Sequence, residues 1–190
     1  TPDDVTQTFS IGDTIPIQWN KTGSIGNLKI TYSAKGDFTD ELVINGNYPS
    51  GADGLVTFSP AWTAPFKVAE TFKVRVTNNA PPTLVPPAGT ELTDTSTANF
   101  GVRPIINTVT SPAAAEVWYG AETTRVVTWE ATSATKTDSS NPKVKIEYSV
   151  DGGAYQQVTG ADNLDSVNGT NNFTWASGIP DLKSENVVVK

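Results

Sequence analysis

Hydrophobic and polar residues alternate strictly in two stretches of the chain, "LKITYS" (28–33) and "KVKIEYSV" (143–150). An alternation with period two is typical of a β-strand that has one buried and one solvated face. Lys35-Gly36 follows the first stretch closely, and Asp151-Gly152-Gly153 directly follows the second. Gly and Asp tolerate the backbone conformations of a tight turn. We therefore expect each stretch to be the first strand of a β-hairpin.

These two stretches belong to a longer internal repeat. Further landmarks recur in the same order, 110 to 116 positions apart. Similarity at a fixed period indicates that each copy is one folding unit. We expect the first domain to span residues 1–102 and the second 103–190. The landmarks are Trp19 and Trp129, Tyr32-Ser33 and Tyr148-Ser149, Gly54…Phe58 and Gly169…Phe173, and the segments that begin at Glu70 and Glu185.

Short strand patterns fill both copies, and no segment shows a sustained helical period. About seven strands per copy, separated by turn residues, predict an all-β fold of two tandem immunoglobulin-like antiparallel β-sandwich domains. Pro16 predicts an edge strand or a bulge, and Trp19 and Trp129 are expected in the cores. The expected strands are 5–9, 14–19, 28–33, 41–45, 54–59, 71–77 and 96–102, then 104–110, 116–118, 124–130, 143–150, 154–159, 170–175 and 186–190.

The second copy has no counterpart of the strand 96–102. A sandwich without its last strand has an open sheet edge, which natural proteins avoid. We therefore expect this domain to be truncated at its last strand, and the parent protein to continue with the missing one.

The series "EVWYG…VVTW…VKIEYSVDGGAY…GTNNFTW", preceded by "STANF", resembles an immunoglobulin-like repeat of large secreted bacterial cell-surface proteins, most closely those of surface layers (S-layers). The resemblance covers nearly all of the second copy. It implies a structural, non-catalytic segment of a long extracellular protein at the cell surface or cell wall. Implied partners are a second copy or neighbouring domains, with a cell-surface glycan as a further candidate. The first copy departs from the pattern, with Ile11-Gly12 in place of Glu-x-Trp and Lys35-Gly36 in place of Asp151-Gly152.

The composition narrows the chemistry further. The chain has no His and no Cys, which excludes Ser-His-Asp and Cys-His catalysis and an imidazole zinc site. The net charge is −7 without a basic patch, which argues against a nucleic-acid partner. No apolar run approaches the roughly 20 residues of a membrane span. Alternatives to the structural role are an adhesin or carbohydrate-binding module, or accessory domains of a secreted enzyme.

One polar loop is a candidate calcium site, and no other cofactor is expected. It carries Asp162, Asn163, Asp165 and Asn168 within seven positions. Calcium prefers such oxygen ligands, although the spacing is not that of an EF-hand. In the alternative interpretation, these side chains cap the turns of their own loop.

Three further features are candidate contact or modification sites. Asn20, Asn168 and Asn172 each begin an Asn-x-Thr triplet, the acceptor pattern for N-glycosylation. Trp118-Tyr119 is either a glycan-binding pair or part of a core or of a contact between domains. The Pro-rich loop 77–94 is either a contact arm or a tolerated insertion. The arm residues are Pro81, Pro82, Leu84, Val85, Pro86 and Pro87.

Overall fold

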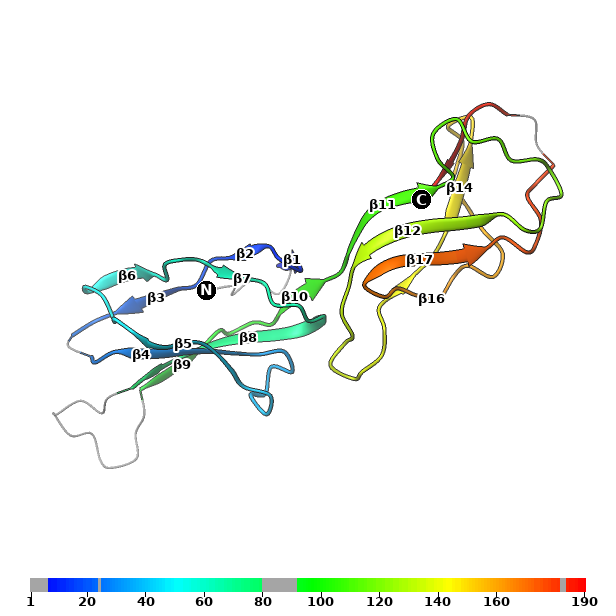
Figure 1. Cartoon of the computed structure of the whole chain (residues 1–190). Helices are drawn as coiled ribbons and strands as arrows, with labels where there is room; N and C mark the ends of the chain where they lie inside the picture. Colours follow the sequence, from blue (N-terminus) through cyan, green and yellow to red (C-terminus); the bar gives the residue numbers. More distant parts are fainter. Residues whose placement is uncertain (1–6, 24, 80–91, 182–183) are drawn as a thin grey trace. The chain divides into compact units, whose positions relative to one another are not determined.

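The computed structural model describes residues 7–23, 25–79, 92–181 and 184–190, and all regular elements of these residues are β-strands (Figure 1). The all-β class predicted from the sequence is thereby confirmed. The chain divides into two compact units, Thr1–Arg103 and Pro104–Lys190. Within each unit several antiparallel sheets surround a hydrophobic core, which is consistent with a β-sandwich.

The largest sheet of the first unit has six strands, in the order β1-β10-β8-β4-β5 with β9 also paired to β8. Its neighbours are antiparallel except β1 and β10, which are parallel. The strand β8 is therefore the centre of this sheet, with β4 on one side and β9 and β10 on the other. The bounds are β1 (Thr8–Ser10), β4 (Leu28–Ser33), β5 (Leu42–Tyr48), β8 (Ala69–Asn78), β9 (Thr93–Thr95) and β10 (Phe100–Arg103).

Two strand pairs complete the first unit, β2 (Thr14–Ile15) with β7 (Trp62–Thr63) and β3 (Gln18–Lys21) with β6 (Gly54–Thr57). The expected strand 14–19 is interrupted at Pro16, because proline has no N–H to donate to a ladder. The core includes Ile15, Ile17, Trp19, Leu28, Ile30, Phe72, Val74, Phe100 and Val102.

The second unit contains two three-stranded sheets, β11-β12-β17 and β15-β14-β18, and the pair β13-β16. The bounds are β11 (Ile105–Ser111), β12 (Val126–Thr132), β13 (Lys143–Val144), β14 (Glu147–Val150), β15 (Gln156–Gln157), β16 (Leu164–Asp165), β17 (Gly169–Thr174) and β18 (Val187–Val189). The core consists of Val127, Trp129, Ala131, Ile146, Tyr148, Val158, Ala161 and Trp175.

The repeat in the sequence is also a repeat in strand pairing. The ladder between β3 and β6 corresponds to that between β12 and β17, and the ladder between β4 and β8 corresponds to that between β14 and β18. Trp19 is 7% exposed and Trp129 is 4% exposed, so both predicted core positions are confirmed. Gly54 and Gly169 begin equivalent strands with φ of 106° and 89°, a conformation that favours glycine.

The expected tight turn after residue 150 is present. Asp151 and Gly152 have φ of 49° and 71°, and Gly153 donates its N–H to Val150 O at 2.8 Å. The strand before this turn is interrupted, however. The N–H of Ile146 donates to Ala161 O, and Ile146 O accepts from Val158 N, so both groups bond outside the expected ladder.

The segment 116–118, expected as a strand, is part of a loop. Glu116 donates its N–H to Ala113 O at 3.0 Å, and Ala113 donates its N–H to Glu116 Oε2 at 2.8 Å. Ala115, between them, has a positive φ of 62°. These local bonds close a turn and compete with strand pairing, as short polar and acidic side chains do.

Candidate functional site

Charged side chains form a network around the loop 34–41, which connects β4 to β5 in the first unit. Ser33 Oγ donates to Asp40 Oδ1 at 2.5 Å and accepts the N–H of Gly36 and Phe38 at 2.9 and 3.2 Å. Lys67 Nζ reaches Asp40 Oδ2 at 3.1 Å. The hydroxyl of one β4 residue thus organises the whole loop.

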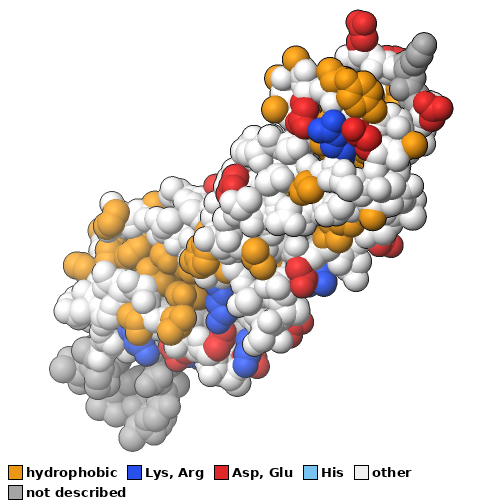
Figure 2. Space-filling view, turned by 45° about the vertical axis from the view of Figure 1, so that its right-hand side comes forward, with side chains coloured by type: hydrophobic (Ala, Val, Ile, Leu, Met, Phe, Trp, Pro, Cys, Tyr) orange, Lys and Arg blue, Asp and Glu red, His pale blue; other side chains and the backbone are white. Residues whose placement is uncertain are grey.

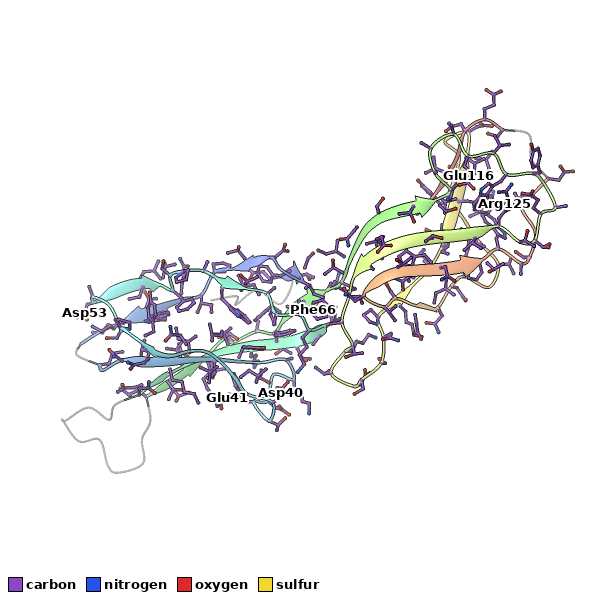
Figure 3. The ribbon with its side chains drawn as sticks, in the orientation of Figure 1. Asp40, Glu41, Asp53, Phe66, Glu116 and Arg125 are labelled. Atoms are coloured by element: carbon purple, nitrogen blue, oxygen red, sulfur yellow. The ribbon has the colours of Figure 1, made fainter. Side chains whose placement is uncertain are left out.

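Glu41 extends this network to two cations. Its carboxylate lies 2.8 Å from Arg75 and 3.4 Å from Lys29. The Arg75 guanidinium carbon lies 4.0 Å from the centre of the Phe38 ring, within the range of a cation–π interaction. Figure 3 shows Asp40 and Glu41 beside each other at the loop 34–41 of the first unit.

Partial burial raises the pKa of both Asp40 and Glu41, but hydrogen bonds outweigh it. Ser33 and Lys67 lower the pKa of Asp40, and Arg75 lowers that of Glu41. Both carboxyl groups are therefore ionised at neutral pH, and their charge stabilises the loop.

A second network surrounds Arg125 in the second unit. Arg125 Nε donates to Glu122 Oε2 at 2.6 Å, and Glu116 Oε1 lies 3.7 Å from Arg125 Nη1. Arg125 Nη2 donates to Val117 O at 3.2 Å, and the guanidinium carbon is 5.8 Å from the ring centre of Trp118. One planar guanidinium thus connects Glu116 and Val117 with Glu122 within the loop 112–123 (Figure 3).

The electrostatics of the described residues favour structural ion pairs over acid–base chemistry. Among the described residues, nine carboxyl groups have a shifted pKa, and all nine shifts are downward. A general acid at neutral pH needs the opposite shift. These nine side chains act as acceptors for cations and for local hydrogen-bond donors.

Of the expected calcium ligands, Asp165 and Asn168 are each already engaged. Asp165 in β16 lies 2.5 Å from Lys143 Nζ, and Asn168 Oδ1 accepts the N–H of Ser133 at 3.2 Å. Asp162 is exposed. In the part of the chain that the structure describes, no three His, Cys, Asp or Glu side chains gather in a way that could hold a metal. Calcium binding stays a prediction. The hydrogen bond of Asn168 connects its loop to Ser133, which is 35 positions away, and does not cap a turn of the loop itself.

The three candidate glycosylation sites are sterically accessible. Asn20 lies in β3, Asn168 in the loop after β16 and Asn172 in β17, and all three are exposed. Exposure is needed for modification, which itself stays a prediction.

The pair Trp118-Tyr119 separates into one packed and one exposed aromatic residue. Trp118 packs edge-on against the buried Trp175, with ring centres 6.2 Å apart. Tyr119 is 66% exposed. The pair therefore does not present two open rings to a sugar. The residues of the expected contact arm, Pro81, Pro82, Leu84, Val85, Pro86 and Pro87, lie outside the described residues.

Sequence reasoning did not identify the network that joins Ser33 to Asp40 or the network around Arg125. Glu122 and Arg125 are three positions apart, and Glu116 precedes them in the Glu-x-Trp motif. This grouping of two acids and one Arg around a Trp was an available signal. Nothing in the sequence indicated that Lys67 would reach Asp40 from a segment 27 residues away.

Comparison with known proteins identifies no relative of the chain. No protein-family model, curated protein or solved structure matches the chain. Among the described residues, no helix has the length and apolarity needed to cross a membrane. A functional proposal therefore rests on the repeat and on the chemistry of the described side chains.

Proposed function

We propose that the chain is a structural, non-catalytic segment of a long extracellular protein that contributes to a cell-surface layer. The observation that carries this proposal is the duplication of one β unit, with equivalent ladders β4-β8 and β14-β18 and equivalent buried tryptophans. In this proposal the copies serve as spacers or lattice elements, and the number of copies sets the length of the array. In this proposal both units are immunoglobulin-like sandwiches.

The chemistry of the chain supports a structural role. Without His and Cys, catalysis would depend on carboxylates. The carboxylates with shifted pKa values are held in their ionised form by hydrogen bonds and by cations such as Arg75 and Arg125. The network of Arg75 fixes the loop 34–41 to strands of the first unit, and the network of Arg125 closes the connection between β11 and β12 in the second.

The surface supports self-association as the means of assembly. On the face shown in Figure 2, hydrophobic side chains form a broad patch on the first unit, and charged side chains are scattered. Exposed hydrophobic residues of that unit include Val43, Leu55 and Phe66. Contiguous apolar patches mark contact surfaces. The net charge of −7 opposes unspecific association, so that ordered contacts depend on specific patches.

Glycan binding is a second candidate function, and Tyr119 is the observation that favours it. Its exposed ring belongs to a loop that Arg125 holds in place. An exposed aromatic ring on a rigid loop is suited to stack on a sugar. A single ring offers a small contact area, so we rank this role below the structural one.

Electron microscopy of the parent protein tests the proposal. We expect ordered sheets or filaments on the cell surface, and we expect deletion of residues 81–87 to weaken their order. Dispersed single molecules at all salt and calcium concentrations, with no lattice on cells, would refute the structural role. Retention of a glycan in that case, with loss on Tyr119→Ala, would support the second candidate.

A further inference from the structure

In the first unit, one continuous segment covers the edge of β8 that faces away from β4. This segment contains β9 and β10, and both pair with β8. Its alternate residues Ser96, Ala98, Phe100 and Val102 are all buried. Alternate burial is the pattern of a strand that lays one face on the core.

The contact between this segment and Val74 of β8 is specific. Val74 O accepts the N–H of Ser96 at 2.9 Å, and Val74 donates its own N–H to Ser96 Oγ at 3.2 Å. Val74 lies opposite Tyr32 in the neighbouring strand β4. The covering segment therefore satisfies both backbone groups that Val74 directs away from β4.

In the second unit, Val189 of β18 occupies the position equivalent to Val74. It lies opposite Tyr148 in β14, and Tyr148 is the repeat counterpart of Tyr32. Lys190 exchanges both of its backbone hydrogen bonds with Glu147, each at 2.9 Å. Backbone groups alternate in direction along an antiparallel strand, so those of Val189 point away from β14. Among the described residues, no strand pairs with this side of β18.

A small apolar slot lies beside this open edge. It has a volume of about 50 Å³ and is lined by residues of β11, β12, β18 and the segment 144–146. The lining includes Ile106, Val109, Trp129, Ile146 and Val189. Val187 and Val188 of the same strand are each nearly half exposed. The edge thus combines free backbone groups with uncovered hydrophobic surface, the two features of a site for β-strand addition.

We propose that the open edge of β18 is a strand acceptor. It binds an extended segment from outside these 190 residues, antiparallel to β18, with small or hydrophobic side chains at alternate positions as in Ser96–Val102. We infer this occupant from the first unit, where the equivalent edge of β8 is covered by the segment Ser96–Val102, whose buried side chains are small or hydrophobic. A second copy is a poorer occupant: β18 has only three residues, and residues 93–103 of each copy already cover the first unit.

A synthetic peptide with the sequence of residues 92–103 tests the proposal on the intact chain. The control peptide carries Asp in place of Ala98 and Phe100. We expect the first peptide, at saturation, to slow amide hydrogen exchange in 184–190 by roughly tenfold or more, because pairing protects edge amides. Exchange in 69–78 should not change, since that edge is already covered. The control peptide should protect neither segment.

Two variants make the test specific to the edge. Val189→Pro removes the outward N–H, while the bonds between Lys190 and Glu147 can remain, and we expect it to abolish peptide protection with an unchanged circular dichroism spectrum. Val188→Thr alters the neighbouring residue in the same strand and should leave protection intact.

Equal protection by both peptides, or none by the first, would overturn the proposal. Protection that rises with protein concentration alone, together with a dimer in light scattering, would assign the edge to a second copy. These measurements use the isolated chain in solution, without assembly into a layer, so their outcome does not depend on the surface-layer proposal.

Discussion

Tyr148 lies directly opposite Val189 in the ladder between β14 and β18, in the register that pairs Tyr32 with Val74 between β4 and β8. The tyrosines are equivalent in the sequence repeat, and the valines are equivalent in the ladders. The register of a ladder decides which side chains face the core. The two units therefore share one pairing scheme, and a substitution in one unit has a matched counterpart in the other.

The buried tryptophans Trp19 and Trp129 are one such matched pair, and replacing each tests the stability of its own unit. We expect Trp129→Ala to lower the free energy of unfolding of the second unit by about 3–5 kcal/mol, and Trp19→Ala to do the same for the first, because each leaves a large cavity. Hydrogen exchange at increasing denaturant concentration measures the free energy of unfolding of each unit separately. Val126→Ala, at a more exposed position of β12, is the control. If both Trp variants unfolded like the parent, the assignment of both rings to the cores would be refuted, and an effect in only one unit would refute the equivalence of the two cores.

Asp40 makes the stability of the first unit depend on pH. Burial raises the pKa of Asp40, but the hydrogen bonds from Ser33 and Lys67 lower it on balance below the ordinary value of 3.8. A carboxyl group whose pKa is lower in the folded state contributes stability above the unfolded value, and this stability is lost as the pH falls through the folded value. We therefore expect the free energy of unfolding to decline as the pH drops below about 4.

Asp40→Asn isolates this contribution. The variant keeps the size of the side chain but loses the ion pair with Lys67, so we expect a loss of about 1 kcal/mol at neutral pH and a weaker dependence on acid. Unfolding by denaturant at several pH values measures both. Asp162→Asn, at an exposed position, is the control. An unchanged acid dependence in Asp40→Asn would mean that other carboxyl groups dominate.

Arg125 should control the order of the loop 112–123. Arg125→Lys keeps the charge but loses the planar fork that contacts Glu122 and Val117 O together. We expect faster hydrogen exchange and faster proteolysis in this loop for Arg125→Lys, and a larger effect for Arg125→Gln. The exchange of β14 should stay as in the parent. Identical loop protection in all three proteins would show that the packing of Trp118 alone holds the loop.

Local patterns predicted much of this fold. The period-two stretch 28–33, the part 147–150 of the second stretch and the Asp-Gly turn follow from neighbouring residues, and the structure contains them. The repeat placed Trp19 and Trp129 in the cores, because equivalent positions in equivalent strands face the same way. These features depend on residues that are close in the sequence or related by the duplication.

The remaining features depend on contacts that the pattern of hydrophobic and polar residues does not show. The strand 143–150 is broken at Ile146 because its backbone bonds with Val158 and Ala161, which no local pattern reveals. Asp40 is held by Lys67 and Glu41 by Arg75, both from beyond the hairpin. At 116–118, apolar residues suggested a strand, but the bonds between Glu116 and Ala113 close a turn. In these cases the structure is decided by individual hydrogen bonds and ion pairs, which the alternation of hydrophobic and polar residues does not indicate.

The polar loop around Asp165 gives the last prediction. Because Asp165 is paired with Lys143 and Asn168 accepts the N–H of Ser133, a calcium ion would have to displace both interactions. We therefore expect EDTA-treated and calcium-loaded samples to have the same melting temperature. A ligand that binds only the folded state would raise it. An increase with calcium but not with magnesium, lost in Asp162→Asn and in Asp165→Asn, would contradict this expectation and establish the loop as a calcium site.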